Sequence, residues 1–380
     1  MHNDGAVFLI GKNIFLRADY VPSDECYCPV EISSWLEAMK CPASYKQLDE
    51  DLSYFQSVNM TGVHAEFLRT FNNPGAQSVC HYVIKNNQVF RECFGEHVGF
   101  KMFVDAILLS LTRRIRLPDV EFYANLGDWP LVKPGSNFPL FSWCGSDDTA
   151  DILWPTYDLT EATLQMLNRV TLDVFSAAAN AEMPWEKREE KAFWRGRDSN
   201  RERLDLVRFS KRKPDIVDAG LTRMFFFRDQ MHEFEPLSPH ISFFDFFQYK
   251  YMVNVDGTVA AYRLPYLLAG ASLVLKQDSK YYEHFYSELI PGEHYRRLQR
   301  DLGDLEARVR EARRDDASAR RVGLAGRRFV LERLHPQHVL CYHVLLLKGC
   351  LRVIQGNSAI FISSRRHSRH FGGCQQNSAR

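Results

Sequence analysis

Arginine, glycine and small polar residues gather at two places in the second half of the chain, each between an apolar run and a helical pattern. The first is Trp194-Arg195-Gly196-Arg197-Asp198-Ser199, and the second runs from Asn254 to Arg263. In both, glycine lets the backbone approach a ligand, and a helix with a nearby guanidinium follows, which is typical of phosphate binding. A surface loop with a solvated ion pair explains the first segment almost as well. The two junctions together favour a diphosphate cleft.

Lys276 follows the next apolar run, Ser272-Leu275. Since the carboxyl ends of parallel strands share one edge of a sheet, we expect its ammonium group at the same edge. An ordinary exposed lysine is the alternative.

Motifs of other chemistries are absent from the sequence. It contains no G-x-S-x-G, no H-E-x-x-H, no Walker lysine loop and no D-x-D at the end of an apolar run. The adjacent acids Asp147-Asp148 are interpreted as a turn cap or a solvent-facing pair. If phosphates bind, arginines neutralise them, so this interpretation requires no metal.

Helical and strand patterns alternate around these motifs, which predicts an α/β fold. In the first half we expect a hairpin over 80–93, a helix over Val98–Arg114, strands over Val120–Leu126 and Asp151–Trp154, and a helix over Thr160–Ala178. In the second half we expect strands over Ala192–Trp194, Met252–Val255 and Ser272–Leu275, and helices over Asn200–Lys211, Phe243–Tyr251 and Tyr262–Leu268. Helices also follow from about Leu302, with a break at Pro336 and a helix over Val339–Leu347.

Length and composition suggest two domains with a linker at Ala179–Glu190, because 380 residues can build two ordinary cores. The predicted parts are an N-terminal arm over 1–61 with helical stretches near Ile32–Lys40 and Tyr45–Phe55, halves over 62–180 and 185–335, a helix crossing back over 336–350, and a disordered tail over 351–380.

Charge and hydropathy exclude several partners. The 48 basic and 47 acidic residues leave a net charge of +1, so no global field attracts nucleic acid or an anionic membrane. No apolar run approaches the roughly 20 residues that span a bilayer, so we expect no membrane insertion. We expect a monomer.

The cysteines indicate disulfides more than zinc, because their spacing lacks the paired C-x₂₋₄-C pattern of structural zinc sites. We predict that Cys341 is bonded to Cys26 or Cys28, which ties the arm to the last clear helix. A turn at Asn86-Asn87 places Cys80 opposite Cys93, where a cross-strand disulfide and two unpaired cysteines are both open. Asn59-Met60-Thr61 is a glycosylation sequon, which fits an oxidising secretory compartment.

Several longer segments resemble one family, the CAP10-type protein O-glucosyltransferases, and its members with a KDEL motif most of all. The similarity covers about residues 24–345, in the same order, and its segments are Cys80-His81-Tyr82, Gly95 to Phe100, Asn125 to Pro130, Phe141 to Cys144, Trp194 to Asp198, Asp256 to Pro265, and Lys276 to Tyr286.

The resemblance implies a GT-B-like fold of two Rossmann-like halves with a cleft between them. It also implies metal-independent, inverting transfer of glucose or xylose from a UDP-sugar to serine in folded EGF-like repeats of Notch- or fibrillin-type proteins, in the lumen of the endoplasmic reticulum. Carried over by motif, Asp128 matches the catalytic base, while Arg197 and Arg263 match the diphosphate ligands. The residues of the nucleotide loop are Thr258, Val259, Ala260, Ala261 and Tyr262, and those at the acceptor and sugar are Trp154, Pro155, Tyr157 and Asp158.

Some features depart from the family pattern. The KDEL-bearing members begin with a signal peptide and a filamin-like domain and end in a retention signal, whereas this chain starts without them and ends Asn377-Ser378-Ala379-Arg380. We therefore expect a truncated start and an alternative end. The Arg-Gly-Arg-Asp segment also leaves open which arginine meets the phosphate.

Two functions remain open from the sequence. The first is an active transferase, and the second is a catalytically inactive lectin-like or chaperone-like binder of EGF domains. An aspartate at a strand exit together with two arginine junctions favours the enzyme, since a pure binder needs neither.

Overall fold

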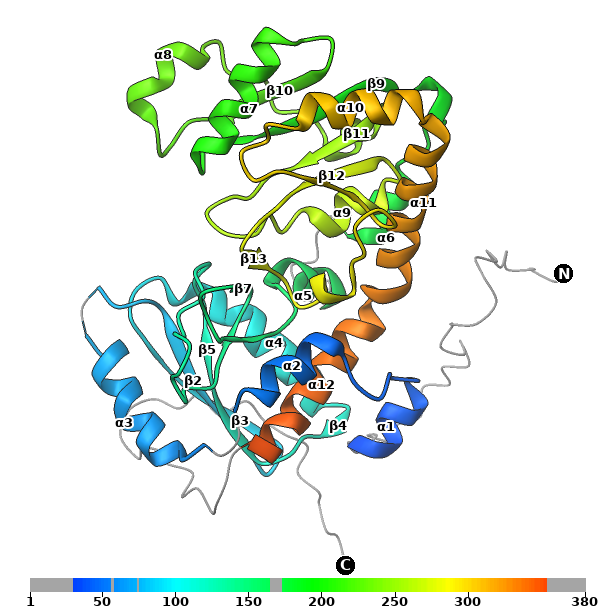
Figure 1. The fold of residues 1–380 in the computed structure, drawn as a ribbon. Coiled ribbons are helices and arrows are strands. Elements are labelled where there is room, and N and C mark those ends of the chain that lie inside the picture. The colour runs from blue at the N-terminus through cyan, green and yellow to red at the C-terminus, as the bar shows by residue number, and fades with distance from the viewer. Residues whose placement is uncertain (1–29, 56–57, 74, 165–172, 354–380) are drawn as a thin grey trace, which may run out of the picture.

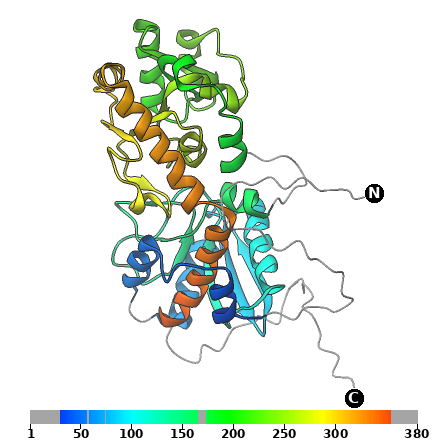
Figure 2. The ribbon, with the colours of Figure 1, turned by 90° about the vertical axis from the view of Figure 1, so that its right-hand side faces the viewer.

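The computed structural model describes residues 30–55, 58–73, 75–164 and 173–353. Two lobes are stacked on one another, and α11 (Asp316–Arg333) and α12 (Pro336–Val353) run down one side from the second lobe into the first (Figure 1, Figure 2). No helix within these ranges has the length and apolar content needed to cross a membrane.

The first half contains a five-stranded mixed sheet in the order β3-β2-β5-β6-β8. Its strands are β2 (Val79–Lys85), β3 (Gln88–Phe94), β5 (Val120–Asn125), β6 (Leu140–Ser142) and β8 (Ile152–Leu153). Strand β2 runs antiparallel to both β3 and β5, while β5, β6 and β8 are parallel to one another.

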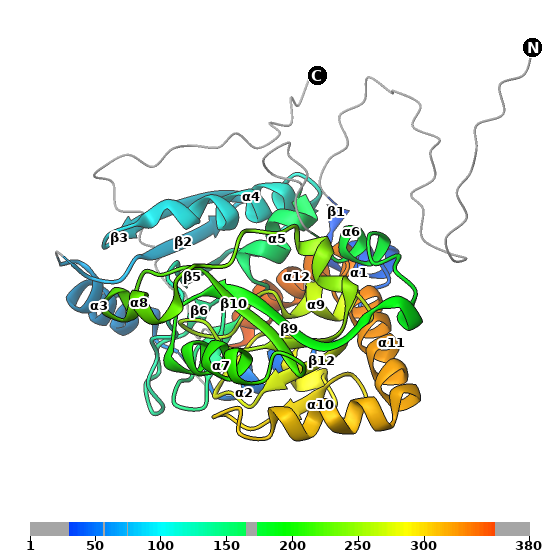
Figure 3. The same ribbon diagram turned by 90° about the horizontal axis from the view of Figure 1, so that it is seen from above.

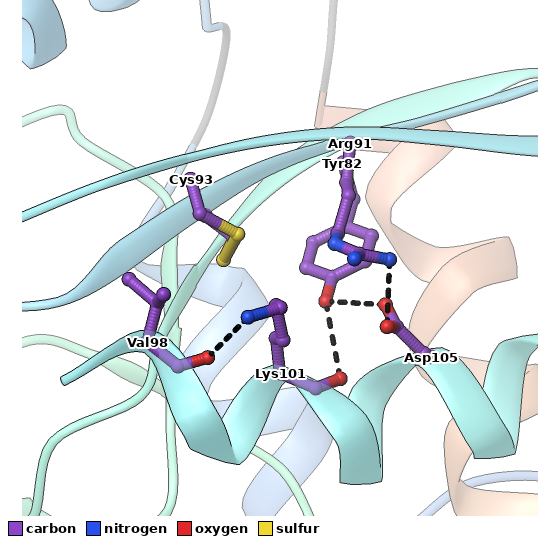
Figure 4. The surroundings of a disulfide bond; sticks show 7 residues. Tyr82, Arg91, Cys93, Val98, Lys101 and Asp105 are labelled. Atoms are coloured by element: carbon purple, nitrogen blue, oxygen red, sulfur yellow. Dashed lines mark hydrogen bonds and ion pairs between the residues drawn. A yellow bond between two sulfur atoms is a disulfide. The ribbon is translucent and has the colours of Figure 1, made fainter. Parts of the chain in front are cut away.

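The β2–β3 hairpin turns at Asn86 and Asn87, which both adopt the left-handed conformation with φ of 49° and 60°. Cys80 and Cys93 face each other in the register and form a disulfide, so the cross-strand prediction is confirmed. Beside this bond, α4 (Lys101–Thr112) packs on the hairpin (Figure 4). Its Asp105 accepts a hydrogen bond from the Tyr82 hydroxyl at 3.0 Å and pairs with Arg91.

The second half contains a five-stranded, all-parallel sheet in the order β10-β9-β11-β12-β14. Its strands are β9 (Glu189–Arg197), β10 (Val217–Arg223), β11 (Tyr249–Asn254), β12 (Leu273–Gln277) and β14 (Arg296–Leu298). Numbered along the chain, the order is 2-1-3-4-5, a doubly wound arrangement that places its ligand site at the β9/β11 switch point.

Alternation along these strands explains the layers of the second half (Figure 3). Tyr251 and Val253 of β11 join the core under α7 (Arg201–Arg212) and α10 (Leu305–Arg314). Met252 between them joins the opposite core, with α6 (Val174–Ala179) and α9 (Leu264–Ala269). Both faces are therefore buried, as parallel sheets require.

The N-terminal segments and α12 belong to the core of the first half. Strand β1 (Val30–Glu31) pairs with β4 (Ile115–Arg116), and α1 (Ile32–Ala38) and α2 (Lys46–Ser53) follow it. Trp35 and Leu48 lie in one cluster with Tyr342 and Leu346 of α12. The segment α3 (Met60–Phe71), which was not predicted, joins the same cluster, and exposed Asn59 of the sequon caps it.

One predicted disulfide is wrong. Cys341 is bonded to Cys41, not to Cys26 or Cys28, which lie outside the described residues. The reason is the turn at the end of α1, where Lys40 adopts φ of 51° and the Cys41 amide donates to Leu36. That turn brings Cys41 directly against α12.

Several predicted elements differ in extent or type. The segment Phe243–Tyr251 is not one helix, because the 3₁₀ helix η4 (Phe243–Gln248) gives way to β11 at Tyr249. The helix over Thr160–Ala178 is described as α5 (Tyr157–Leu164) and α6, with 165–172 outside the description. Pro336 begins α12, where its missing N–H costs nothing, and α12 continues to Val353. The remaining tail lies outside the described residues.

The remaining short elements are η1 (Val98–Phe100), β7 (Gly145–Ser146), η2 (Trp185–Lys187), η3 (Arg228–Gln230), α8 (Met231–Phe234), β13 (Tyr281–Tyr282) and η5 (Tyr286–Glu288).

Candidate active site

Asp128 lies in the loop that leaves β5, and a chain of buried polar groups fixes this loop. The Asn125 amide, fully buried at the end of β5, donates to the Trp129 carbonyl at 2.6 Å and to the Ser142 hydroxyl at 3.1 Å. Ser142 donates to Asp151 at 2.6 Å, and Asp151 accepts two further backbone amides of the loop. The Asp128 backbone is therefore held on both sides, and its half-buried carboxyl group stays partly open to a ligand.

Burial raises the pKa of Asp128 above its ordinary value, and the charge of Arg197 from the second half opposes this shift. Asp158, at the start of α5, responds to the same field. Burial raises its pKa to about 6, and the charges of Glu161 and Asp128 contribute further. Asp128 thus interacts electrostatically with Arg197 of the second half and with Asp158 of the first.

The structure distinguishes the two arginines that the sequence left open. Both are residues of β9, since the strand continues through Arg197. Arg195 binds Asp218 at 2.7 Å and donates to the Asp218 carbonyl, so its charge is used within the sheet. Arg197 is exposed and forms no ion pair with a carboxylate among the described residues. Arg197 is therefore the arginine available to an anion.

Arg203, which was not identified from the sequence, joins the two strand-to-helix junctions that contain arginine and glycine. It is buried on α7 and donates to the carbonyls of Arg197, Val255 and Asp256, at 3.0, 3.2 and 2.6 Å. Burial, with the nearby charge of Arg263, lowers the pKa of Arg203 to about 9, which leaves it protonated at neutral pH. Its position in the first turn of an arginine-rich helix was the only signal in the sequence.

The loop after β11 contains mostly small residues and is partly buried. Gly257 lies against Arg203, where an added Cβ would stand 3.3 Å from the guanidinium. Val259 and Ala260 pack with Cys144 of the first half. Arg263 is half-buried at the start of α9, donates to the Arg195 carbonyl at 2.6 Å, and has its pKa lowered to about 10 by burial. Thr258, Ala261 and Tyr262 complete this loop at the boundary of the halves.

Lys276 is buried, so the exposed alternative is wrong. Its ammonium group lies 4.6 Å from the centre of the Tyr286 ring, in a cation–π contact. Burial lowers its pKa, while the charges of Asp256 and Glu283 oppose this effect.

The four residues expected near acceptor and sugar divide into two groups. Trp154 is 2% exposed and stacks on Trp143, and Pro155 is buried beside it, so both side chains lie in the core. Tyr157 and Asp158 are half-buried. The Tyr157 ring contacts Tyr262 edge to face at 5.6 Å, which links α5 to the nucleotide loop.

A short antiparallel ribbon joins the halves next to Asp128. Strand β13 of the second half pairs with β7 of the first, at the boundary of the two lobes (Figure 1). The Cys144 thiol, just before β7, donates to the Asp128 carbonyl at 3.3 Å. Glu283, just after β13, is fully buried, and burial raises its pKa to about 8. This second missed residue gave no signal of its own, since a lone glutamate has no diagnostic spacing.

Among the described residues, no group of three or more His, Cys, Asp or Glu side chains could hold a metal ion. The cation whose charge acts on Asp128 is Arg197. The arrangement can therefore take a proton at one strand exit and stabilise an anionic leaving group at the opposite one.

Comparison with known proteins gives a consistent result. Residues 36–358 match Glycosyl transferase family 90. Protein O-glucosyltransferase 2 of Danio rerio is 50% identical over 339 residues, which cover 88% of this chain and 67% of that protein. Protein O-glucosyltransferase 3 of Homo sapiens is 44% identical over 344 residues, which cover 89% and 68%.

The chain belongs to glycosyl transferase family 90. The match to family 90 spans both halves and α12, and it includes Asp128, Arg197 and Arg263. A crystal structure of TarM aligns with 42% of this chain and 35% of its own, at 12% identity and a TM-score of 0.35. Membership of family 90 makes the chain a glycosyltransferase, and its own sheets show a mixed α/β fold with parallel strands in both.

Proposed function

We propose that this chain is an inverting protein O-glucosyltransferase that moves glucose or xylose from a UDP-sugar to a serine hydroxyl in a folded EGF-like repeat of a Notch- or fibrillin-type protein. One observation carries the proposal. The half-buried Asp128 carboxyl group lies within the field of Arg197, which stands at a strand exit of the other half. A general base and a phosphate ligand therefore share one site.

In the proposed reaction, Asp128 accepts the serine proton while the serine oxygen attacks the anomeric carbon. The bond between that carbon and the UDP oxygen breaks, and its electron pair leaves on the β-phosphate. Attack from the face opposite UDP inverts the anomeric configuration. Arg197 and Arg263 stabilise the developing phosphate charge, so that proposed chemistry uses no metal.

The architecture that supports this reaction is a GT-B-like pair of halves. The second half, over 185–335, presents its β9 and β11 exits to the UDP-sugar, and the first half, over 62–180, presents Asp128 to the acceptor. Loop 258–262 supplies the nucleotide-facing surface, with Lys276 behind it. Tyr157 and Asp158 face the sugar and acceptor, while Trp154 and Pro155 support them from the core.

The lumen of the endoplasmic reticulum is the proposed compartment. Two disulfides, Cys41–Cys341 and Cys80–Cys93, support it, because such bonds persist in oxidising compartments.

A transfer assay tests the proposal. The purified chain is incubated with UDP-glucose or UDP-xylose and a folded EGF-like repeat, in excess chelator and with added manganese. Intact mass should rise by one sugar, only on the repeat that retains its acceptor serine. A serine-to-alanine repeat is the control. Binding of the repeat without any transfer would instead assign the chain to a catalytically inactive binder.

A further inference from the structure

Two phenylalanine side chains project from the loop that follows β10. Phe225 is 55% exposed and Phe226 is 49% exposed, and their rings contact each other edge to face at 5.1 Å. The next residue, Phe227, packs partly against the core. Large contiguous aromatic surface of this kind is rare on a protein unless a partner covers it.

The backbone beneath these rings is fixed. Asp198, fully buried at the end of β9, accepts hydrogen bonds from the amides of Phe225, Phe226 and Phe227 at 2.7, 2.8 and 2.7 Å. Because three donors share one carboxylate, the loop keeps its shape without a ligand. The rings are therefore presented in advance, which lowers the entropic cost of binding.

The aromatic pair lies beside the active site. The Arg197 guanidinium stands 6.0 Å from the centre of the Phe226 ring, and the same arginine acts on Asp128. Across the site, Trp129 follows Asp128 directly and is 45% exposed, with its ring 6.1 Å from that of Tyr281. Exposed aromatic side chains from both halves thus lie near Asp128.

The surroundings of the pair are basic. Arg223 lies opposite Arg197 in the register of β10 and β9, and Arg228 stands 5.1 Å from the centre of the Phe225 ring. Arg201 and Arg223 are exposed, as is Arg228, and none of the three forms an ion pair with another described residue. Asp229 is the single acid in the loop 224–230. Aromatic and arginine side chains together are the composition of a protein interface.

We propose that Phe225 and Phe226, with Arg223 and Arg228, form a docking surface for an acidic face of the folded acceptor domain. This inference rests on the proposed function, since the acceptor serine must reach Asp128. A protein fits better than the nucleotide, because two projecting, exposed rings offer no enclosed slot for a base. The surface lies on the side of the second lobe opposite α11 (Figure 1, Figure 3).

The test is the double variant Phe225→Ala/Phe226→Ala, because the Asp198 bonds to the backbone do not need the rings. The Kd of the folded acceptor, measured with UDP present, should rise about tenfold or more, as for loss of interface hot spots. The Kd of UDP should stay unchanged. Phe225→Tyr/Phe226→Tyr should restore acceptor binding, and Phe175→Ala, on α6 and 50% exposed, is the matched control.

Charge reversal tests the acidic partner. Arg223→Glu/Arg228→Glu should weaken acceptor binding most at low salt, because exposed charges are screened at high salt. An unchanged acceptor Kd in the phenylalanine variant, or an equal loss of UDP affinity, would overturn the docking surface while leaving the transferase proposal intact. Absence of both transfer and acceptor binding by the unaltered chain would refute both, whereas binding without transfer would refute the transferase alone.

Discussion

Buried or half-buried polar side chains fix both the loop after β5 and the strand exits of the second half, but the groups that bind the backbone differ. Asn125, Ser142 and Asp151 hold the first with an amide, a hydroxyl and a carboxylate. Arg203 and Arg263 hold the second by donating to backbone carbonyls. The loop after β5 is thus held by neutral and acidic groups, whereas guanidinium groups bind the backbone at the exits of β9 and β11.

This difference also separates support from chemistry. In the first half the supporting acid, Asp151, is buried, and the acid left partly open is Asp128. In the second half the supporting cation is Arg203, and the exposed one is Arg197. Substitution of a supporting residue, Asp151 or Arg203, should lower stability. Substitution of Asp128 or Arg197 should instead lower turnover.

Asp128→Asn is the change with the largest expected effect. The amide keeps the shape of the side chain but cannot accept the serine proton, so transfer should fall by at least about 10²–10⁴-fold. UDP binding should persist, and both are measured on one preparation. Asp147→Asn, an exposed acid of the same half, is the control and should keep full activity. Near-normal transfer by the asparagine variant would move the role of base to Asp158.

Removal of the Cys41–Cys341 bond should destabilise the first half selectively. The bond closes a loop with a sequence separation of 300 and joins two parts of one core. Cys41→Ser should lower the free energy of unfolding by about 2–4 kcal/mol. Hydrogen exchange should locate the loss in α2 and α12, with β11 and β12 unaffected. Equal loss of hydrogen-exchange protection in both halves would contradict a selective effect of the bond on the core of the first half.

Substitution of Arg197 and of Arg195 should separate an effect on ligand binding from an effect on stability. Arg197→Ala should weaken UDP binding by about 1.5–3 kcal/mol, the typical contribution of a charge-assisted hydrogen bond. Arg195→Ala removes the ion pair with Asp218 instead. It should lower the melting temperature with little change in UDP affinity, as isothermal titration calorimetry can determine. The reverse pattern would assign the phosphate to Arg195.

The smallest expected effect is a shift in the pH dependence of kcat/KM. Burial places the pKa of Asp128 above its ordinary value, and the positive charge of Arg197 lowers it. The base must be ionised, so kcat/KM should fall as the pH drops through that raised pKa. Arg197→Gln removes the opposing charge, hence the acidic limb should move to higher pH. A limb that stays in place, or moves to lower pH, would exclude electrostatic contact between these residues.

The sequence predicted the features that local pattern determines. Asn86-Asn87 predicted the hairpin and the placement of Cys80 opposite Cys93, though not whether they are bonded, and strand patterns placed Asp128 at a strand exit. What it missed depends on distant packing. Arg203 has its role only because the loops at Arg197 and Asp256 converge on it, and Cys41 meets Cys341 only through a turn at Lys40.

Local sequence pattern also did not predict that the sheet of the first half is mixed. The hairpin prediction implied an antiparallel pair, but nothing in the sequence of β2 showed that it inserts between β3 and β5 and makes the sheet mixed. The α3 pattern of Met60, Val63, Phe67 and Phe71 was sufficient for a helix in principle. The predicted arm ended at residue 61, within this helix, and no element was predicted between it and the hairpin.

The position of α12 has a consequence for synthesis on the ribosome. The core of the first half is completed by residues that leave the exit tunnel after the whole second half, since Tyr342 and Leu346 fill it. Cys41 must wait for a partner 300 residues later, about 15–60 s at 5–20 residues per second. Cys93 follows Cys80 within a second or a few. The two disulfides should therefore form in a fixed order. The second half can assemble before α12 completes the core of the first half.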